Sequence, residues 1–150
     1  MGEYVSDKNG RAGGKAGSRS AIEPNREGVR VLTVDDQAIF RRVANDVIVA
    51  TLGFEPIGEA GSGEEAVTAV ERLRPDLVLL DVRMPGIGGI EAARRITSVH
   101  PDTVVILISI EEPNEVEHAV RGSGAATLVR KQDFGPSLLR RLWAEHAGTT

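Results

Sequence analysis

The sequence contains no cysteine among its 150 residues, and aromatic residues make up only 3% of it. The absence of cysteine excludes a disulfide scaffold, a thiolate zinc site and a cysteine nucleophile. No apolar run approaches the roughly 18 residues that a membrane-spanning helix needs. The polar N-terminus, MGEYVSDKNG, does not resemble a secretory signal. We therefore expect a soluble, cytoplasmic protein that does not enter a membrane.

The chain also lacks an excess of positive charge. Its formal net charge is -4, and residues 29–150 alone carry 13 basic and 18 acidic side chains. An acidic domain without a basic stripe argues against nucleic acid as a direct ligand. Within residues 29–150 the only lysine is Lys131, because every other basic residue there is arginine. Such a lysine indicates a position where a compact point charge is needed instead of a planar guanidinium.

Composition divides the chain into three segments. Residues 1–28 are rich in Gly, Ser, Lys and Arg and show no apolar periodicity, so we expect a flexible N-terminal tail. Residues 29–146 have the length of one domain with a single core. Residues 147–150 are expected to form a short C-terminal tail, and we expect no second, output domain.

Five apolar segments predict strands that alternate with helices. The runs Val29–Val34, Leu77–Leu80 and Val104–Ile108 are nearly continuous, which is typical of strands buried on both faces. Ala125–Val129 is weaker, and Glu55–Ala60 contains Pro56, which favours the edge of a sheet.

Apolar stripes between and after these runs predict five helices. The stripes consist of Ile39, Val43 and Val47; Ala66, Val70 and Leu73; Ile90, Ala93 and Ile96; Val116, Ala119 and Val120; and Leu138, Leu139, Leu142 and Trp143. Ser62, three residues before Glu65, resembles a capping box at the start of the second helix. The alternation predicts an α/β protein with a flavodoxin-like (βα)5 three-layer sandwich and a five-stranded parallel sheet of order 2-1-3-4-5.

Polar side chains follow the predicted strands at the edge where such folds bind ligands. Asp35 and Asp36 follow the first strand and Asp81 the third, whereas Ser109 and Lys131 follow the fourth and fifth. Crowded carboxylates repel one another unless protons or a cation relieve them. Mg²⁺ characteristically uses one or two carboxylates together with a phosphate oxygen. The cluster therefore indicates Mg²⁺-assisted phosphoryl transfer, in which a carboxylate can act as the nucleophile.

Four motifs carry a resemblance to a known family. VLTVDD, DLVLLDVRMPGIGG, ILIS and LVRK, in this order and spacing, resemble the receiver (phosphoacceptor) domain of two-component response regulators. The resemblance is greatest to receivers that usually precede a helix-turn-helix output domain, and it covers about residues 29–143.

The resemblance implies a role for each residue of the cluster. Asp81 would accept a phosphoryl group from the phosphohistidine of a sensor histidine kinase or a histidine phosphotransfer protein. Mg²⁺ or Mn²⁺ would be bound by Asp35, Asp36, Asp81 and the backbone carbonyl of Arg83. Lys131 would contact the phosphoryl group. Ser109 would move toward it and reshape the face made by the fourth helix, fifth strand and fifth helix, for a downstream partner, a phosphorelay or a homodimer.

Several residues depart from the family pattern. Ile110 stands where many receivers have a small residue, Leu128 where an aromatic residue is common, and Gln132 where proline often follows the lysine. Arg83 and Glu111, each two residues beyond a residue of the cluster, are predicted to pair across the mouth of the site. Such a pair would slow the attack of water on the acyl phosphate.

Three other interpretations stay open from the sequence. Asp35 and Asp36 can cap the first helix, and Asp81 can form a turn. A degenerate receiver would bind partners without being phosphorylated. A phosphatase would use Asp81 as its nucleophile, but the haloacid-dehalogenase type has a second Asp where this chain has Arg83. We therefore expect a signalling switch and not a turnover enzyme acting on small molecules.

Overall fold

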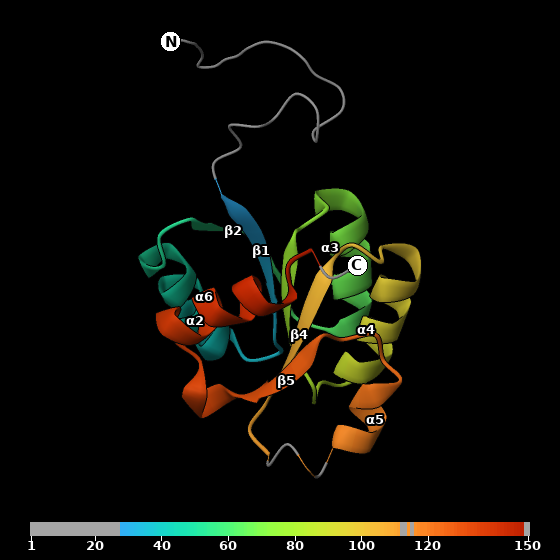
Figure 1. Ribbon diagram of the computed structural model, residues 1–150. Coiled ribbons are helices and arrows are strands. Elements are labelled where there is room, and N and C mark those ends of the chain that lie inside the picture. Colours follow the sequence, from blue (N-terminus) through green and yellow to red (C-terminus); the bar gives the residue numbers. More distant parts are fainter. Residues whose placement is uncertain (1–27, 112–113, 115, 149–150) are drawn as a thin grey trace, which may run out of the picture.

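The computed structural model describes residues 28–111, 114 and 116–148, so the predicted flexible tail lies, apart from Gly28, outside the described residues. Five strands form one parallel sheet in the order β2-β1-β3-β4-β5 (Figure 1). Their bounds are Val29–Val34 for β1, Phe54–Ala60 for β2, Leu77–Asp81 for β3, Val104–Ser109 for β4 and Thr127–Arg130 for β5. The predicted fold class and strand order are confirmed.

Helices cover both faces of the sheet. Figure 1 shows α2 (Ala38–Ala50) and α6 (Pro136–His146) on one face, with α3 (Gly63–Leu73), α4 (Gly88–Val99) and α5 (Glu117–Arg121) on the other. A 3₁₀ turn, η2 (Lys131–Asp133), joins β5 to α6. In the described part of the chain, no helix combines the length and apolarity that crossing a bilayer requires.

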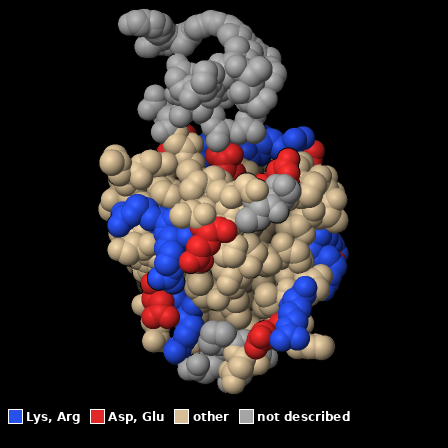
Figure 2. Space-filling view, in the orientation of Figure 1, with Lys and Arg blue, Asp and Glu red and all other residues tan. Residues whose placement is uncertain are grey.

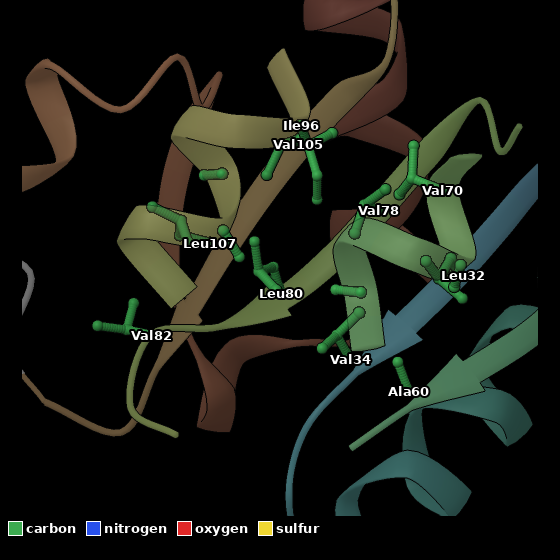
Figure 3. Close-up of a cluster of buried hydrophobic side chains, with 14 of the residues drawn as sticks. Leu32, Val34, Ala60, Val70, Val78, Leu80, Val82, Ile96, Val105 and Leu107 are labelled. Carbon is green, nitrogen blue, oxygen red and sulfur yellow. The ribbon is translucent and has the colours of Figure 1, made fainter. Parts of the chain in front are cut away.

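Successive residues of the central strands enter two separate cores, because side chains alternate across a sheet. Leu32, Leu80 and Leu107 pack toward α3 and α4, together with Val70 and Ile96 (Figure 3). Val31, Leu79 and Ile106 pack on the opposite face, toward α2 and α6. All three central strands are therefore enclosed, as their continuous apolar runs predict.

The strand that contains Pro56 lies at the sheet edge, as predicted. Its pairing with β1 shifts there, since Val31 pairs with Pro56 whereas Leu32 pairs with Gly58. Proline has no N–H for the ladder, and an edge position with an irregular register tolerates that loss.

The first predicted helix is present as α2, but two of the three residues of its predicted apolar stripe are exposed. Ile39 and Val43 are 78% and 47% exposed, whereas Ala44 and Ile48 are fully buried. Val47 packs against the core as predicted, but Ile39 and Val43 lie off the buried face because α2 is apolar on more than one side. The last strand begins at Thr127 instead of Ala125, and Ala119 of α5 is exposed.

The capping interpretation of Ser62 is confirmed. Its hydroxyl accepts a hydrogen bond from the Glu65 N–H at 3.1 Å. The Glu65 carboxylate accepts in turn from the Gly61 N–H, one residue earlier than in a standard capping box. The start of α3 is thereby fixed relative to the end of β2.

Charged side chains are intermixed on the surface. Figure 2 shows basic groups next to acidic groups on the face it presents. Glu91 pairs with Arg94 and Arg95 along α4, and Glu117 pairs with Arg121 along α5. Exposed pairs of this kind contribute well under about 1 kcal/mol each, so they neutralise the surface more than they stabilise the fold.

Glycine at position 89 is required by the close approach of the backbone of Asp81. A Cβ on Gly89 would lie 2.0 Å from the carbonyl oxygen of Asp81, whereas a Cβ on Gly122 would meet nothing within 4 Å. We predict that Gly89→Ala lowers the free energy of unfolding by about 2–3 kcal/mol through overpacking. Gly122→Ala should change it by less than about 0.5 kcal/mol. Urea denaturation of both variants measures the difference, and equal effects would contradict the structure.

Candidate functional site

The ends of four strands bring the predicted residues to one edge of the sheet. Asp35 directly follows β1, and Asp81 is the last residue of β3, next to β1. Ser109 ends β4 and pairs with Arg130, the residue before Lys131. The parallel order of the sheet therefore determines which side chains meet.

The three carboxylates form a compact group. Asp35, Asp36 and Asp81 each offer an oxygen, and these oxygens all lie within 4.8 Å of one another. Asp35 is fully buried and Asp81 is 7% exposed, whereas Asp36 is exposed. The Oδ1 atom of Asp35 accepts a hydrogen bond from the Gln37 N–H at 2.8 Å. This bond closes a local turn before α2. The N-cap residue of α2 is Gln37 and no side-chain hydrogen bond caps this helix, so the interpretation of Asp35 and Asp36 as helix caps is wrong.

Lys131 supplies the positive charge nearest to this group. Its Nζ atom lies 2.7 Å from Oδ2 of Asp35 and 3.8 Å from Oδ1 of Asp81, and its side chain is 14% exposed. An ion pair shielded from water in this way is stronger than one on the surface. The single lysine of the domain is therefore directed at the carboxylates.

The environment strongly perturbs Asp81. The pKa of Asp81 is raised from its ordinary 3.8 to about 7. Burial is the largest cause and the negative charge of Asp35 is the second, while the positive charge of Lys131 lowers this pKa. Asp36 raises this pKa further, and a hydrogen bond from the Arg83 backbone lowers it. Without a cation, Asp81 is therefore partly protonated near neutral pH, and a bound cation would favour its ionised form.

The donor set fits a hard divalent ion. Oδ2 of Asp35 is buried and accepts no hydrogen bond of good geometry from the described residues, although the Lys131 ammonium lies close to it. Carboxylate oxygens and a nearby backbone carbonyl are ligands that Mg²⁺ prefers. The group of aspartates can therefore hold such a metal ion, with Arg83 as the predicted source of the carbonyl.

Ser109 and its loop lie beside this group. Ser109 is 1% exposed, and its Oγ accepts a hydrogen bond from the Glu111 N–H at 2.9 Å. The hydroxyl proton stays available for another acceptor. Ile110 is 71% exposed, so its side chain extends into solvent and is not packed in the core.

Arg83 and Glu111 pair across the mouth of the site, as predicted. Nε of Arg83 lies 2.8 Å from Oε2 of Glu111, with side-chain exposures of 66% and 26%. This contact joins the loop after β3 to the loop after β4. The two loops that flank Asp81 are thereby linked on the solvent side.

The other departures from the family pattern have ordinary packing roles. Leu128 packs against the core between the sheet and α3 and α4. Gln132 accepts a hydrogen bond from Arg130 at 3.1 Å. Neither side chain contributes a charge near the carboxylates.

Two residues of α2 were not predicted from the sequence, one that contacts Lys131 and one that contacts the backbone of Asp35. The Phe40 ring lies under the Lys131 ammonium, 4.6 Å from Nζ to the ring centroid. Arg41 donates to the Asp35 carbonyl at 2.7 Å and also pairs with Glu59. Their positions on the first turns of a helix that starts beside Asp36 were the signal available in the sequence.

Comparison with known proteins gives a consistent result. Residues 31–142 match the family described as response regulator receiver domain. The chain is 38% identical over 103 residues to the response regulator GacA of Pseudomonas viridiflava, covering 69% of this chain and 48% of that protein. It is 39% identical over 110 residues to a protein-glutamate methylesterase/protein-glutamine glutaminase of Geobacter metallireducens, covering 71% of this chain and 32% of that protein. The chain thus spans at most about half the length of these relatives.

Solved structures share the architecture. The signal receiver domain of the putative response regulator NarL from Mycobacterium tuberculosis matches with a TM-score of 0.74 at 29% identity, covering 83% of this chain and 99% of that one. A chain of the CheX–CheY–BeF3–Mg complex from Borrelia burgdorferi matches with a TM-score of 0.70 at 28% identity, covering 78% and 88%.

The raised pKa of Asp81 predicts a pH-dependent stability. Between about pH 4 and pH 7 the folded chain keeps a proton on Asp81 that the unfolded chain has released, so stability falls as pH rises through this window. Asp81→Asn removes the ionised group and should raise the Tm of the metal-free protein by several degrees at about pH 8, but much less at about pH 4.5. Thermal scans at both pH values measure this.

Two controls belong to that measurement. Asp102→Asn changes an exposed aspartate and should leave the Tm nearly unchanged at either pH. Added Mg²⁺ should raise the Tm of the wild type more than that of Asp81→Asn, since a ligand stabilises only the form that binds it. An Asp81→Asn protein that is less stable than wild type at about pH 8 would contradict the crowding argument.

Proposed function

The chain belongs to the response regulator receiver domain family, and on this premise we propose that it is a phosphorylation-controlled switch whose phosphoacceptor is Asp81. A carboxylate oxygen of Asp81 attacks the phosphorus of a phosphohistidine on a sensor histidine kinase or a histidine phosphotransfer protein. The P–N bond breaks and an acyl phosphate forms. Water later cleaves this acyl phosphate and returns the carboxylate. The observation that carries the proposal is the convergence of three carboxylates and one buried lysine at the sheet edge.

Mg²⁺ or Mn²⁺ would be held by Asp35, Asp36, Asp81 and the backbone carbonyl of Arg83. When bound, the metal supplies positive charge that counters the carboxylates and the oxygens of the incoming phosphoryl group. The similar CheX–CheY complex of Borrelia burgdorferi contains magnesium and beryllium trifluoride. The crowded oxygens of this chain support the same class of ligand.

Lys131 and Ser109 would respond to the phosphoryl group. The Lys131 ammonium, already 3.8 Å from Oδ1 of Asp81, gains a stronger anionic partner when that oxygen carries phosphate. The Ser109 hydroxyl can donate to a phosphoryl oxygen and so displace the loop that it holds through Glu111. This movement would alter the face made by α5, β5 and α6.

We assign the output of the switch to protein contacts. The face of α5, β5 and α6 would bind a downstream partner, pass phosphate in a relay or pair with a second copy of the chain. On the face that Figure 2 presents, the intermixed charges give no support for direct binding to nucleic acid. The site would turn over only its own phosphorylation, so the protein would not act as an enzyme on small molecules.

A phosphorylation assay tests the proposal. With Mg²⁺ and acetyl phosphate as a small phosphodonor, intact-mass spectrometry should detect the addition of one phosphoryl group to the wild type. The adduct should not form when the metal is chelated before the reaction, and it should be absent from Asp81→Asn. Asp102→Asn, which changes an exposed aspartate distant from the carboxylates, should be phosphorylated like the wild type.

The other outcomes separate the alternative functions. Sustained hydrolysis of a phosphomonoester would identify a phosphatase and contradict the switch. Complete absence of an adduct on properly folded protein would favour the degenerate receiver, an interaction module that works without phosphorylation. An adduct that persists in Asp81→Asn would place the phosphoacceptor elsewhere.

The Arg83–Glu111 pair predicts a long-lived phosphorylated state. The pair bridges the loops on either side of Asp81 and so limits the approach of water. Glu111→Ala should speed dephosphorylation by about two- to fivefold, because an exposed pair contributes up to about 1 kcal/mol. Release of phosphate from the purified phosphoprotein measures the rate.

Two further variants make this measurement specific. Arg83→Ala should have the same effect, and the double variant should add little, since both changes remove one contact. Glu91→Ala removes the two surface ion pairs with Arg94 and Arg95 on α4 and should leave the rate unchanged. An unchanged or slower rate in Glu111→Ala would discard the role of the pair.

A further inference from the structure

Lys131 is held by an aromatic ring as well as by carboxylates. Its Nζ atom lies over the ring of Phe40, 4.6 Å from the centroid, while the same atom is 2.7 Å from Asp35 and 3.8 Å from Asp81. A ring face attracts a cation electrostatically, most strongly where water is excluded. Since the Lys131 side chain is only 14% exposed, this condition is met.

The Phe40 ring is itself fixed in place. It packs at the margin of the core between the sheet and α2 and α6, and against Phe134 with ring centroids 6.3 Å apart and an interplanar angle of 53°. Such tilted pairs are favourable arrangements of aromatic rings. Phe134 follows η2, and its N–H donates to the carbonyl of Lys131 at 3.2 Å. The ring pair thus joins the side chain of Lys131 to its own backbone turn.

This arrangement restricts a side chain that is otherwise flexible. Lysine has a four-carbon stem with many rotamers, and its charge has no directional fork to orient it. The ion pair with Asp35 fixes the distance to one carboxylate, whereas the ring face adds a second, independent contact from another element. An aliphatic side chain at position 40 would fill the same space without attracting the ammonium.

We propose that Phe40 is a positioning residue, which holds the Lys131 ammonium at the phosphoacceptor site through the face of its ring. This inference builds on the proposed function, because it requires that Asp81 is phosphorylated and that Lys131 contacts the phosphoryl group. Phe40 touches neither the phosphoryl group nor the metal ligands in this role. Its effect passes through Lys131.

The first measurement detects the contact directly and does not depend on activity. The chain has three lysines, at positions 8, 15 and 131, so the NMR signals of labelled lysine Cε–Hε groups are few, and Lys131→Arg assigns the one at issue. The ring current of Phe40 should move the Lys131 signal upfield of the other two. Phe40→Leu should abolish this shift, and Phe40→Tyr should keep most of it.

The second measurement is the rate of phosphorylation by acetyl phosphate with Mg²⁺. Phe40→Leu should slow it about three- to tenfold, the size expected for loss of one shielded cation–π contact. Phe40→Tyr should restore most of the rate. Phe54→Leu is the matched control, since Phe54 packs against the same core and has no ring contact with Lys131 among the described residues. It should leave both the NMR shift and the rate unchanged.

The outcomes separate this inference from the proposed function. Equal rates for Phe40→Leu and Phe54→Leu, with the wild type phosphorylated, would overturn the positioning role and leave the phosphoacceptor in place. An unshifted Lys131 signal in the wild type would also overturn it, by removing the contact. A wild type that forms no adduct at all would overturn the proposed function and the positioning role together, even if the shifted signal were present. Thermal scans of each variant identify any loss of rate that comes from unfolding.

Discussion

The backbone holds Asp35, Asp36 and Asp81 close together, so their carboxylates repel one another. Asp81 ends β3 and is paired in the ladder with Ile108, while Asp35 directly follows β1, the other neighbour of β3. Each carboxylate pair at such distances costs about 1 kcal/mol in water and about 4 kcal/mol near a protein surface. Burying one large apolar side chain contributes about 1.5–3 kcal/mol, and the central strands bury many. The core can therefore hold the carboxylates together.

The formal charge of the site matches one divalent cation. Three ionised carboxylates and the Lys131 ammonium leave two negative charges, which one divalent cation would neutralise. Without that cation, protonation of Asp81 reduces the negative charge, and the raised pKa of Asp81 reflects this tendency. In the proposed function, the same carboxyl group would be a poor nucleophile while the site lacks positive charge and a better one once a cation is bound. Metal binding and reactivity would then be coupled through Asp81.

The sequence predicted the central strands and the buried faces of α3, α4 and α6, but it failed on the face of α2. Val29–Val34 was located without error because its apolar run is nearly continuous and four of its six residues are buried. On α2, apolar residues occupy more than one face, so periodicity did not distinguish the buried Ile48 from the exposed Ile39. That error concealed Phe40, since a ring beside Lys131 depends on how the helix is rotated against β5. Strand ends predicted the meeting of Asp35, Asp81 and Lys131 because chain topology alone determines it.

The site has an enclosed side and an open side, which differ in their exposure to solvent. On the enclosed side, Asp35 is fully buried, and Phe40 packs against Phe134 and beneath the Lys131 ammonium. On the open side, Asp36 is exposed, and Arg83 and Glu111 meet on loops where each can exchange its partner for water. In the proposed function, formation of an acyl phosphate would depend on the geometry of the enclosed groups, whereas its hydrolysis would depend on access through the open side. Substitutions in the loops would then change the lifetime of the phosphorylated form while the chemistry of its formation stays the same.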